Sequence, residues 1–217
     1  MTSPTAPLEV LYEDNHAIAV VKPHGMLVQG DNTGDASLMD KVKAYLKEKY
    51  HKPGDVFLGL VHRLDRPVGG IVIFGKTSKG AARLSEQFRS HTVEKVYTAT
   101  VEGCPAELEG AVVLWLKKNE ATNHVTAFKK ETPGALKAEL SYKVLESDGQ
   151  RSKIEVRPKT GRPHQIRVSM QHLGCPIVGD KKYGAKTTFD GGIALVATKL
   201  SFDKPVGGER VTITNIQ

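Results

Sequence analysis

The sequence is poor in cysteine and in long apolar runs, and both shortages exclude classes of protein. Its two cysteines, Cys104 and Cys175, belong to no CxxC pair, so a disulfide scaffold, a zinc site and a dithiol redox site all lack support. The longest apolar runs, residues 17–21 and 111–116, are far shorter than the ~20 residues needed to span a bilayer. The first seven residues do not read as a signal peptide. We expect a cytoplasmic protein with both thiols reduced and buried.

Motifs for metals, serine hydrolysis and dinucleotides are also missing. The eight histidines are scattered without HExxH spacing, and no GxSxG elbow occurs. Gly69 and Gly70 lack the spaced third glycine and the following helix of a dinucleotide site. We therefore expect neither a metal nor a cofactor.

Positive charge is present in excess. The chain carries 31 Lys and Arg against 24 Asp and Glu, which gives a net charge of +7. An excess of this size draws polyanions to a protein surface without naming which one. The charge alone therefore favours a nucleic-acid partner only slightly.

The order of the expected elements mixes strand hairpins with isolated helices, which predicts an α+β fold. Helices are expected at residues 37–50 and 78–89, and a third begins near Pro163 and ends near Leu173. Neither a linker nor an internal repeat divides the chain, so we expect a single domain over residues 1–217. Strands are expected at residues 8–12, 16–21, 56–61, 70–74, 94–101, 111–116, 123–128, 137–145, 153–157, 193–202 and 210–214.

Local signals mark the first and third helices. Ser37 and Asp40 have the spacing of a capping box. In the third helix, a polar stripe at helical spacing contains His164, Arg167 and Gln171. The opposite face is expected to be buried through Ile166, Met170 and Leu173. Such a stripe beside the free amides of a helix start suits an anion such as phosphate, although an ordinary solvated face explains it equally well.

Residues 62–70, HRLDRPVGG, place an acid between two arginines. Asp65 lies between Arg63 and Arg66, and the segment connects two apolar runs. Loops at the edge of a core are where sites are usually built. The cationic neighbours favour the ionised carboxylate, which serves as a nucleophile or a base. A simple turn with an Asp–Arg pair is the competing interpretation.

These segments together resemble the RluA family of RNA pseudouridine synthases. HRLD at residues 62–65 resembles the active-site motif of the family, and KPHG at residues 22–25 resembles its KPxG element. KVYTA at residues 95–99 is similar to its tyrosine strand. GRPHQIR at residues 161–167, followed by GD and YG at residues 179–184, resembles its GRxHQIR…GDxxYG block.

The four motifs occur in the order of the family, and the resemblance covers about residues 8–202. The chain departs from the pattern at Val68-Gly69-Gly70, where the family often has Thr-Ser-Gly, and at Ser169 and Val196, where it often has His. The few residues before Leu8 are too short for the S4-type domain of some relatives, so we expect a stand-alone catalytic domain.

The resemblance implies an isomerase that converts specific uridines in structured rRNA or tRNA to pseudouridine, with the target base flipped out of its stack. Asp65 would be the nucleophile, Arg167 the cation paired with it, and Tyr97 the ring that stacks on the uracil. RNA contacts would come from Arg63, Arg162 and His164. The implied fold is a mixed, mostly antiparallel sheet with a few flanking helices. No cofactor, membrane or obligate protein partner is implied, and a monomer is expected.

Two other functions remain open. A catalytically idle RNA-binding module would use the same basic surface without the chemistry of Asp65. A nucleoside or glycoside hydrolase would also use a carboxylate against a sugar carbon, but a retaining glycosidase needs two carboxylates about 5–5.5 Å apart. The motifs supply no obvious second acid.

Overall fold

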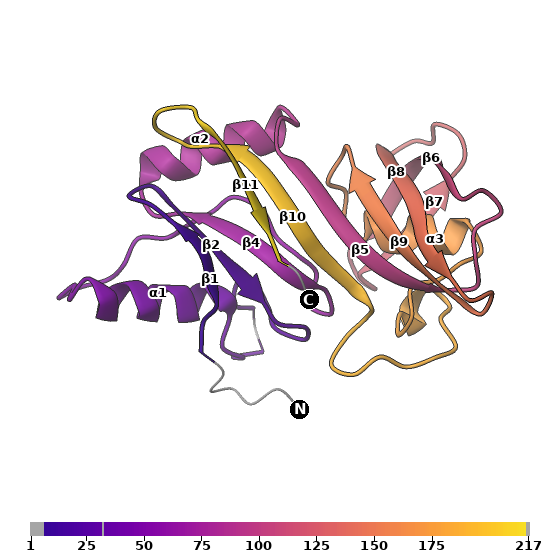
Figure 1. The fold of residues 1–217 in the computed structure, drawn as a ribbon, viewed down its shortest axis with the longest axis horizontal. Helices are drawn as coiled ribbons and strands as arrows, with labels where there is room; N and C mark the ends of the chain where they lie inside the picture. The colour runs from indigo at the N-terminus through magenta and orange to yellow at the C-terminus, as the bar shows by residue number, and fades with distance from the viewer. Residues whose placement is uncertain (1–6, 32, 216–217) are drawn as a thin grey trace. The chain divides into compact units, whose positions relative to one another are not determined.

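The computed structural model describes residues 7–31 and 33–215. Its elements can be followed along the colour gradient of Figure 1. The chain divides into two compact units: unit 1 comprises Met1–Glu94 and Ala197–Gln217, and unit 2 comprises Lys95–Val196. The expectation of a single catalytic domain stays a prediction.

The described residues of unit 1 form two helices and the first and last strands of the structure. The strand order is β1–β2–β4–β10, with β3 beside β4 and β11 beside β10. The β2–β4 and β10–β11 pairs are antiparallel. The elements are β1 (Val10–Glu13), β2 (Ala17–Lys22), α1 (Leu38–Lys49), β3 (Gly59–Leu60), β4 (Gly69–Gly75), α2 (Ser78–Arg89), β10 (Leu195–Asp203, whose first two residues belong to unit 2) and β11 (Arg210–Thr214).

Side-chain caps fix the starts of both helices of unit 1. Ser37 accepts a hydrogen bond from the Asp40 amide, and the Asp40 carboxylate accepts one from the Ser37 amide, so the predicted capping box is confirmed. Thr77 caps α2 through the Gly80 amide. Helix α2 has the predicted bounds, and Leu84 is its fully buried contact with the sheet.

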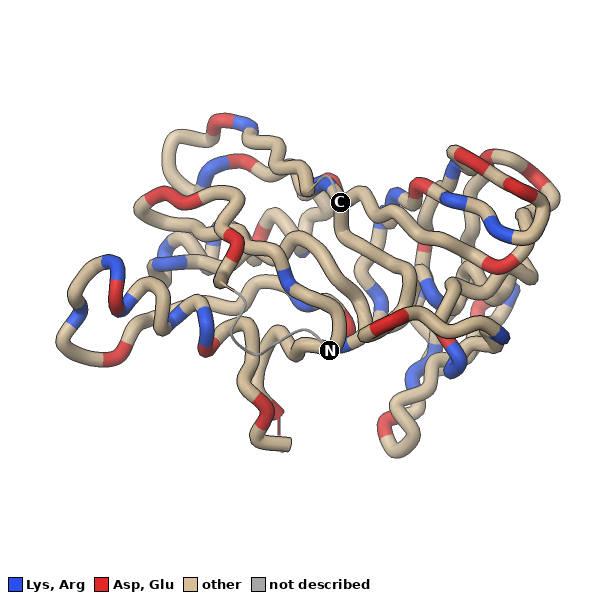
Figure 2. The backbone as a smooth tube through the Cα atoms, turned by 60° about the horizontal axis from the view of Figure 1, so that its bottom comes forward, with Lys and Arg blue, Asp and Glu red and all other residues tan. Residues whose placement is uncertain are grey.

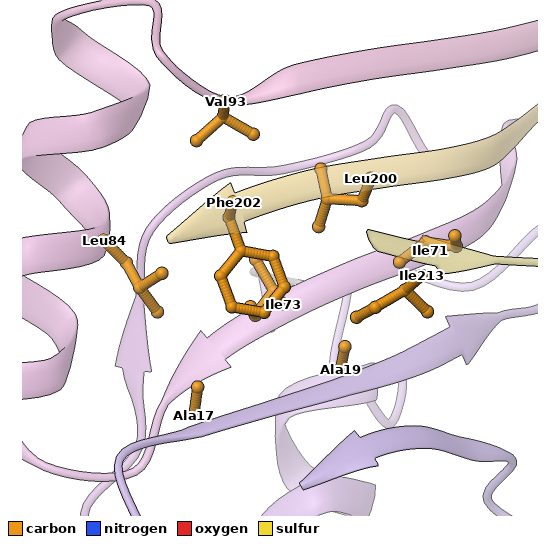
Figure 3. Packing of buried hydrophobic residues seen from close by; sticks show 9 residues of the cluster. All are labelled: Ala17, Ala19, Ile71, Ile73, Leu84, Val93, Leu200, Phe202 and Ile213. Carbon is orange, nitrogen blue, oxygen red and sulfur yellow. The ribbon is translucent and has the colours of Figure 1, made fainter. Parts of the chain in front are cut away.

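A hydrophobic cluster joins α2 to the strands of unit 1. Figure 3 shows Leu84 of α2 directed toward Phe202 of β10, with Ile73 of β4 beside it. Each of these three side chains is essentially inaccessible to solvent. At roughly 25 cal/mol per Å² of apolar surface, such residues each contribute about 2–3 kcal/mol to folding. The full cluster is Ala17, Ala19, Ile71, Ile73, Leu84, Val93, Leu200, Phe202 and Ile213.

Unit 2 is an antiparallel sheet in the order β5–β9–β8–β6–β7. Its single α-helix, α3, packs against β6, β7 and the 3₁₀ helix η1. The elements are β5 (Glu94–Glu102, whose first residue belongs to unit 1), β6 (Glu109–Asn119), β7 (His124–Phe128), β8 (Leu136–Ser147), β9 (Arg151–Pro158), α3 (Gln165–His172) and η1 (Lys181–Tyr183).

The α+β class and the mostly antiparallel pairing are confirmed. One expected strand is wrong: of residues 56–61, only Gly59–Leu60 pair as β3. The apolar residues that suggested a strand, Val56 and Leu58, are buried from a loop instead. The thiols also differ from expectation, because Cys175 is buried while Cys104 is exposed.

One expectation for the region around α3 is wrong. The helix begins at Gln165, after an N-cap at His164 in the left-handed region (φ 52°), so Pro163 lies outside its first turn. Of the polar stripe, His164 and Arg167 are buried and Gln171 is exposed, so an ordinary solvated face does not describe it. Asp180 and Tyr183, farther along the chain, supply hydrogen-bond partners for the two buried side chains, so these side chains need no hydrogen bonds from solvent. Gly174 ends the helix with φ 76°, as its position predicted.

Candidate functional site

The Asp65 segment is a tight turn that leads into β4 of unit 1. The Asp65 carbonyl accepts a hydrogen bond from the Val68 amide at 3.0 Å. The Asp65 side chain is half-buried, while its neighbour Leu64 is 8% exposed. Gly70 has φ 109°, and a Cβ there would lie 2.3 Å from the Ala197 carbonyl oxygen. The turn therefore requires glycine at position 70 for its backbone to approach β10.

Lys22 anchors this turn from inside unit 1. Its side chain is fully buried at the end of β2. Its ammonium donates hydrogen bonds to the carbonyls of Pro23, Met26 and Arg66 at 3.0, 2.7 and 3.0 Å. Burial lowers the pKa of Lys22 to about 7, a shift that the nearby Asp65 carboxylate opposes and Arg66 reinforces. A buried cation close to Asp65 thus fixes the main chain that carries the acid.

Further contacts join residues 22–25 to the Asp65 turn. The Gly25 amide donates to the Arg66 carbonyl, and Arg66 Nε donates back to the Gly25 carbonyl. His24 Nδ1 lies 2.9 Å from the Pro67 carbonyl oxygen. A Cβ at Gly69 would lie 2.7 Å from His24 Nε2, so the glycine that departs from the family pattern fits this histidine. Two motifs separated by about forty residues in sequence form one structure.

The remaining side chains between positions 62 and 77 either contact other parts of unit 1 or face solvent. His62 Nε2 accepts from the Ile73 amide, and its ring stacks on Phe88 with centroids 4.5 Å apart. Arg63 is exposed, as an RNA contact requires. Residues 70–77, GIVIFGKT, have the spacing of a phosphate-binding loop. They do not form one, because Gly69–Gly75 is a buried strand.

In unit 2, Arg167 is held by a bidentate ion pair. Its Nε and Nη2 donate to the two carboxylate oxygens of Asp180 at 2.7 and 2.8 Å. The two side chains are 7% and 1% exposed. The guanidinium carbon also lies 5.0 Å from the centroid of the Tyr183 ring, a cation–π contact. Two parallel hydrogen bonds fix the plane of the guanidinium, which a single contact would not do.

His164 belongs to the same buried cluster. Its Nδ1 lies 2.6 Å from the Tyr183 hydroxyl, which also accepts a hydrogen bond from the Val125 amide at 3.0 Å. With 9% of its surface exposed, His164 joins the start of α3 to η1 and β7. Contact of His164 with RNA stays a prediction, and its burial favours a role in positioning α3.

Tyr97 and Arg162 have more open surroundings. Tyr97 is half-buried on β5, opposite Val156 of β9. Arg162 Nε donates to the Lys137 carbonyl at 3.0 Å, and its side chain is partly accessible. Figure 2 shows Lys and Arg interspersed with Asp and Glu along the tube of each unit. The net positive charge is therefore not collected in one run of the chain.

The structure brings some of the predicted residues together within each unit. Unit 1 joins Asp65 to residues 22–25, and unit 2 joins His164 to Arg167. The pairing of Arg167 with Asp65 and the stacking role of Tyr97 stay predictions. Among the described residues, no cluster of three or more His, Cys, Asp or Glu side chains is arranged to hold a metal. No helix in that part of the chain is long and apolar enough to cross a membrane.

Three residues of the site were missed as individual candidates: Lys22, Asp180 and Tyr183. Each lies inside a segment that carried the family resemblance, but nothing in a single segment says which of its members is buried. Asp180 follows Arg167 by thirteen residues, so helical spacing does not relate them. Their partners became visible only in three dimensions.

Comparison with known proteins gives the class that this fold and these motifs define. The structure of human RNA pseudouridylate synthase domain containing 4 superposes with a TM-score of 0.80, covering 96% of this chain and 88% of that one at 23% identity. The fold is therefore that of a pseudouridine synthase. A family model for RNA pseudouridylate synthases matches residues 16–172. The chain belongs to the RluA family of RNA pseudouridine synthases.

Individual relatives differ in length and in named substrate. An uncharacterized RNA pseudouridine synthase of Synechocystis is 32% identical over 95% of this chain and 64% of its own length. Ribosomal large subunit pseudouridine synthase C of Vibrio parahaemolyticus is 35% identical over 81% of this chain and 52% of its own. The tRNA pseudouridine synthase C of Haemophilus ducreyi is 33% identical over 95% of this chain and 90% of its own length. The chain thus spans about half to two thirds of the length of the first two.

Proposed function

We propose that this protein isomerises uridine to pseudouridine in structured RNA, with the Asp65 carboxylate as the nucleophile. The bond from uracil N1 to ribose C1′ breaks, and a bond from uracil C5 to C1′ forms. The proton on C5 leaves and N1 gains one, so atoms and charge balance without an oxidant or a phosphate donor. The anchored Asp65 turn is the observation that carries this proposal, because a nucleophile must be held at a fixed place.

Asp65 is the residue best suited to the role in unit 1. Its turn is tied to residues 22–26 by the Lys22 ammonium and by the Gly25–Arg66 pair. A tied main chain lets the carboxylate meet a ribose or a uracil ring without prior reorganisation.

Arg167 is proposed as the ion-pair partner of Asp65. The Asp180 carboxylate accepts hydrogen bonds from Nε and Nη2 of its guanidinium and fixes its orientation, and a guanidinium has five N–H donors in a planar fork that suits carboxylates. Tyr97 is proposed to stack on the flipped uracil. Flipping costs a few kcal/mol and least in a loop, which favours structured RNA with exposed loops as substrate.

Relatives named for ribosomal RNA and for tRNA make both substrate classes candidates here. Arg63 and Arg162 are proposed RNA contacts, Arg63 because it is exposed and Arg162 because it borders the start of α3. Phosphate contacts from such side chains give affinity that falls with salt concentration.

The test is product analysis with the purified chain. Large-subunit rRNA and tRNA from cells lacking the gene, each carrying tritium at C5 of uridine, are incubated separately with the protein. We expect tritium release to water from one of them, equal in amount to the pseudouridine formed. Free uracil as the product would favour a nucleoside or glycoside hydrolase. No release from either RNA, or from total cellular RNA labelled in the same way, would favour a catalytically idle RNA-binding module.

A further inference from the structure

Lys95 is a half-buried cation on the strand that carries Tyr97. The two residues are separated by one position in β5, so their side chains leave the same face of the strand. Their Cα atoms are about 7 Å apart along the strand, a spacing comparable with the size of one nucleotide. Lys95 therefore lies beside the ring proposed to stack on the target base.

The charge of Lys95 has little compensation within the protein. Its Nζ donates one long hydrogen bond, 3.4 Å, to the Thr160 carbonyl. Across residues 7–31 and 33–215, no carboxylate forms an ion pair with it. Burial lowers its pKa, with no opposing charge among the causes. Lys22, by contrast, donates to three carbonyls. A desolvated ammonium with one long hydrogen bond would be stabilised by a further anion.

Residues 160–162, which lie beside Lys95, are held by hydrogen bonds and are partly exposed to solvent. Gln165 Oε1 accepts from Thr160 Oγ1 at 2.7 Å and from the Arg162 amide at 3.0 Å, while Gln165 Nε2 donates to the Glu139 carbonyl at 2.9 Å. Gly161 between them is exposed, and a Cβ there would lie 3.9 Å from Lys95 Nζ. The absence of a side chain at Gly161 leaves the space beside the ammonium free.

We infer that Lys95 Nζ binds a backbone phosphate of the substrate RNA, at the nucleotide that stacks on Tyr97. Arg162 follows Gly161 in sequence, and its Nε donates to the Lys137 carbonyl, so we assign the phosphate to Lys95 alone. This inference rests on the proposed function, since it assigns the base to Tyr97. A phosphate fits better than a base oxygen because it supplies the charge that the buried ammonium lacks, and it is the only anionic group of a nucleotide in RNA.

The experiment measures how RNA affinity depends on salt. The probe is a fluorescein-labelled twelve-nucleotide oligouridylate, and its dissociation constant is measured over a series of NaCl concentrations. For Lys95→Gln we expect the slope of log affinity against log salt to be shallower than that of wild type by about 0.7, the value for one phosphate contact on a single strand. Lys95→Arg keeps the charge and is expected to keep the wild-type slope.

Lys153→Gln is the matched control. Lys153 lies opposite Thr100 on β9, on the other face of the sheet, with 48% of its side chain exposed. The Lys153→Gln substitution removes one positive charge, as Lys95→Gln does, and is expected to leave the salt slope unchanged. A slope for Lys95→Gln equal to that of wild type, or an equal change for Lys153→Gln, would overturn the inference.

Two further readouts separate the possible failures. Thermal unfolding shows whether Lys95→Gln is folded. If it is not, Lys95→Met replaces it in the salt series. A lysine with a purely structural role would change the stability without changing the salt slope. In the tritium assay, Lys95→Gln is expected to raise KM at least threefold with kcat within twofold of wild type. Absence of release by the wild type would refute the proposed function, whereas the salt slopes would still report the phosphate contact.

Discussion

The Asp65 turn of unit 1 and helix α3 of unit 2 both present a charged group, but they are held in different ways. The turn is held through its main chain, by an ammonium that donates to three carbonyls. Arg167 of α3 is held through its side chain, by the two oxygens of Asp180. Main-chain anchoring fixes the position of the turn, whereas side-chain anchoring fixes the direction of one guanidinium.

The difference predicts unequal sensitivity to substitution. A buried ion pair leaves an uncompensated charge when one partner is removed, and that penalty is large. A buried ammonium bound to neutral carbonyls leaves only unsatisfied acceptors, and that penalty is smaller. Unit 2 should therefore lose more stability than unit 1 when its anchor is removed.

The largest effect is expected for Asp180→Asn. The substitution removes the Asp180 carboxylate from the buried Arg167 side chain, which is 7% exposed, and should lower the free energy of unfolding by about 3–5 kcal/mol. Urea unfolding measures this change. Glu86→Gln breaks the exposed pair with Arg89 and should cost less than about 1 kcal/mol. Equal losses for the two variants would contradict the account of Arg167.

A double substitution sharpens the same point. Arg167→Met with Asp180→Leu replaces the buried pair by apolar side chains, which is often neutral for stability. We expect the double variant to recover most of the stability lost in Asp180→Asn but to release no tritium, because it lacks Arg167. Recovery of both stability and activity would show that Arg167 has no part in the reaction.

An intermediate effect is expected for Glu13, a carboxylate of unit 1 with several donors. Burial opposes its ionisation, but hydrogen bonds from Lys49, Lys76, Tyr50 and Tyr45 prevail and lower its pKa to about 2. An acid with a depressed folded-state pKa stabilises the fold above its unfolded value, and this contribution is lost as the pH falls.

Glu13→Gln should therefore remove about 3 kcal/mol at neutral pH, because the pKa of Glu13 falls from 4.5 to about 2 on folding and a tenfold change in proton affinity corresponds to about 1.36 kcal/mol. Between pH 5 and pH 2 the stability of wild type should fall toward that of the variant. Urea titrations at several pH values measure this convergence. Glu48→Gln, an exposed change on α1, is the control. Parallel curves for wild type and Glu13→Gln would contradict the prediction.

The smallest loss of stability, about 2 kcal/mol, is expected for Lys22→Met. Methionine keeps the apolar stem but leaves three carbonyls without a donor. Because the Asp65 turn then shifts, kcat should fall at least tenfold, while KM for RNA stays within twofold. Steady-state tritium release measures both constants. The control Lys47→Met, on the exposed end of α1, should change neither kcat nor KM. A wild-type kcat for Lys22→Met would show that Lys22 does not position Asp65.

Local signals in the sequence predicted most of the fold. The Ser37–Asp40 capping box, the bounds of α2 and the strand β11 each depend on neighbouring residues, and each is confirmed. The start of α3 was wrong, and the burial of its polar stripe was left open, because both depend on distant residues. Asp180 and Tyr183 let polar side chains of α3 be buried, and no periodicity within the helix reveals them.

The candidate site was predictable to a similar depth. Asp65 stands out in sequence because two arginines flank it in one short segment. Lys22 does not, because a lysine at the end of a strand usually faces solvent, and its burial depends on carbonyls from residues 23, 26 and 66. Composition likewise could not predict that Cys104 is exposed while Cys175 is buried.

The most direct test of the central claim is tritium release by Asp65→Asn compared with Asp55→Asn, an exposed acid ten residues earlier in unit 1. Asparagine keeps the shape of the side chain but cannot act as an anionic nucleophile. We predict that Asp65→Asn binds RNA like wild type and releases no tritium, while Asp55→Asn releases it at the wild-type rate. Release by Asp65→Asn at the wild-type rate would contradict the account.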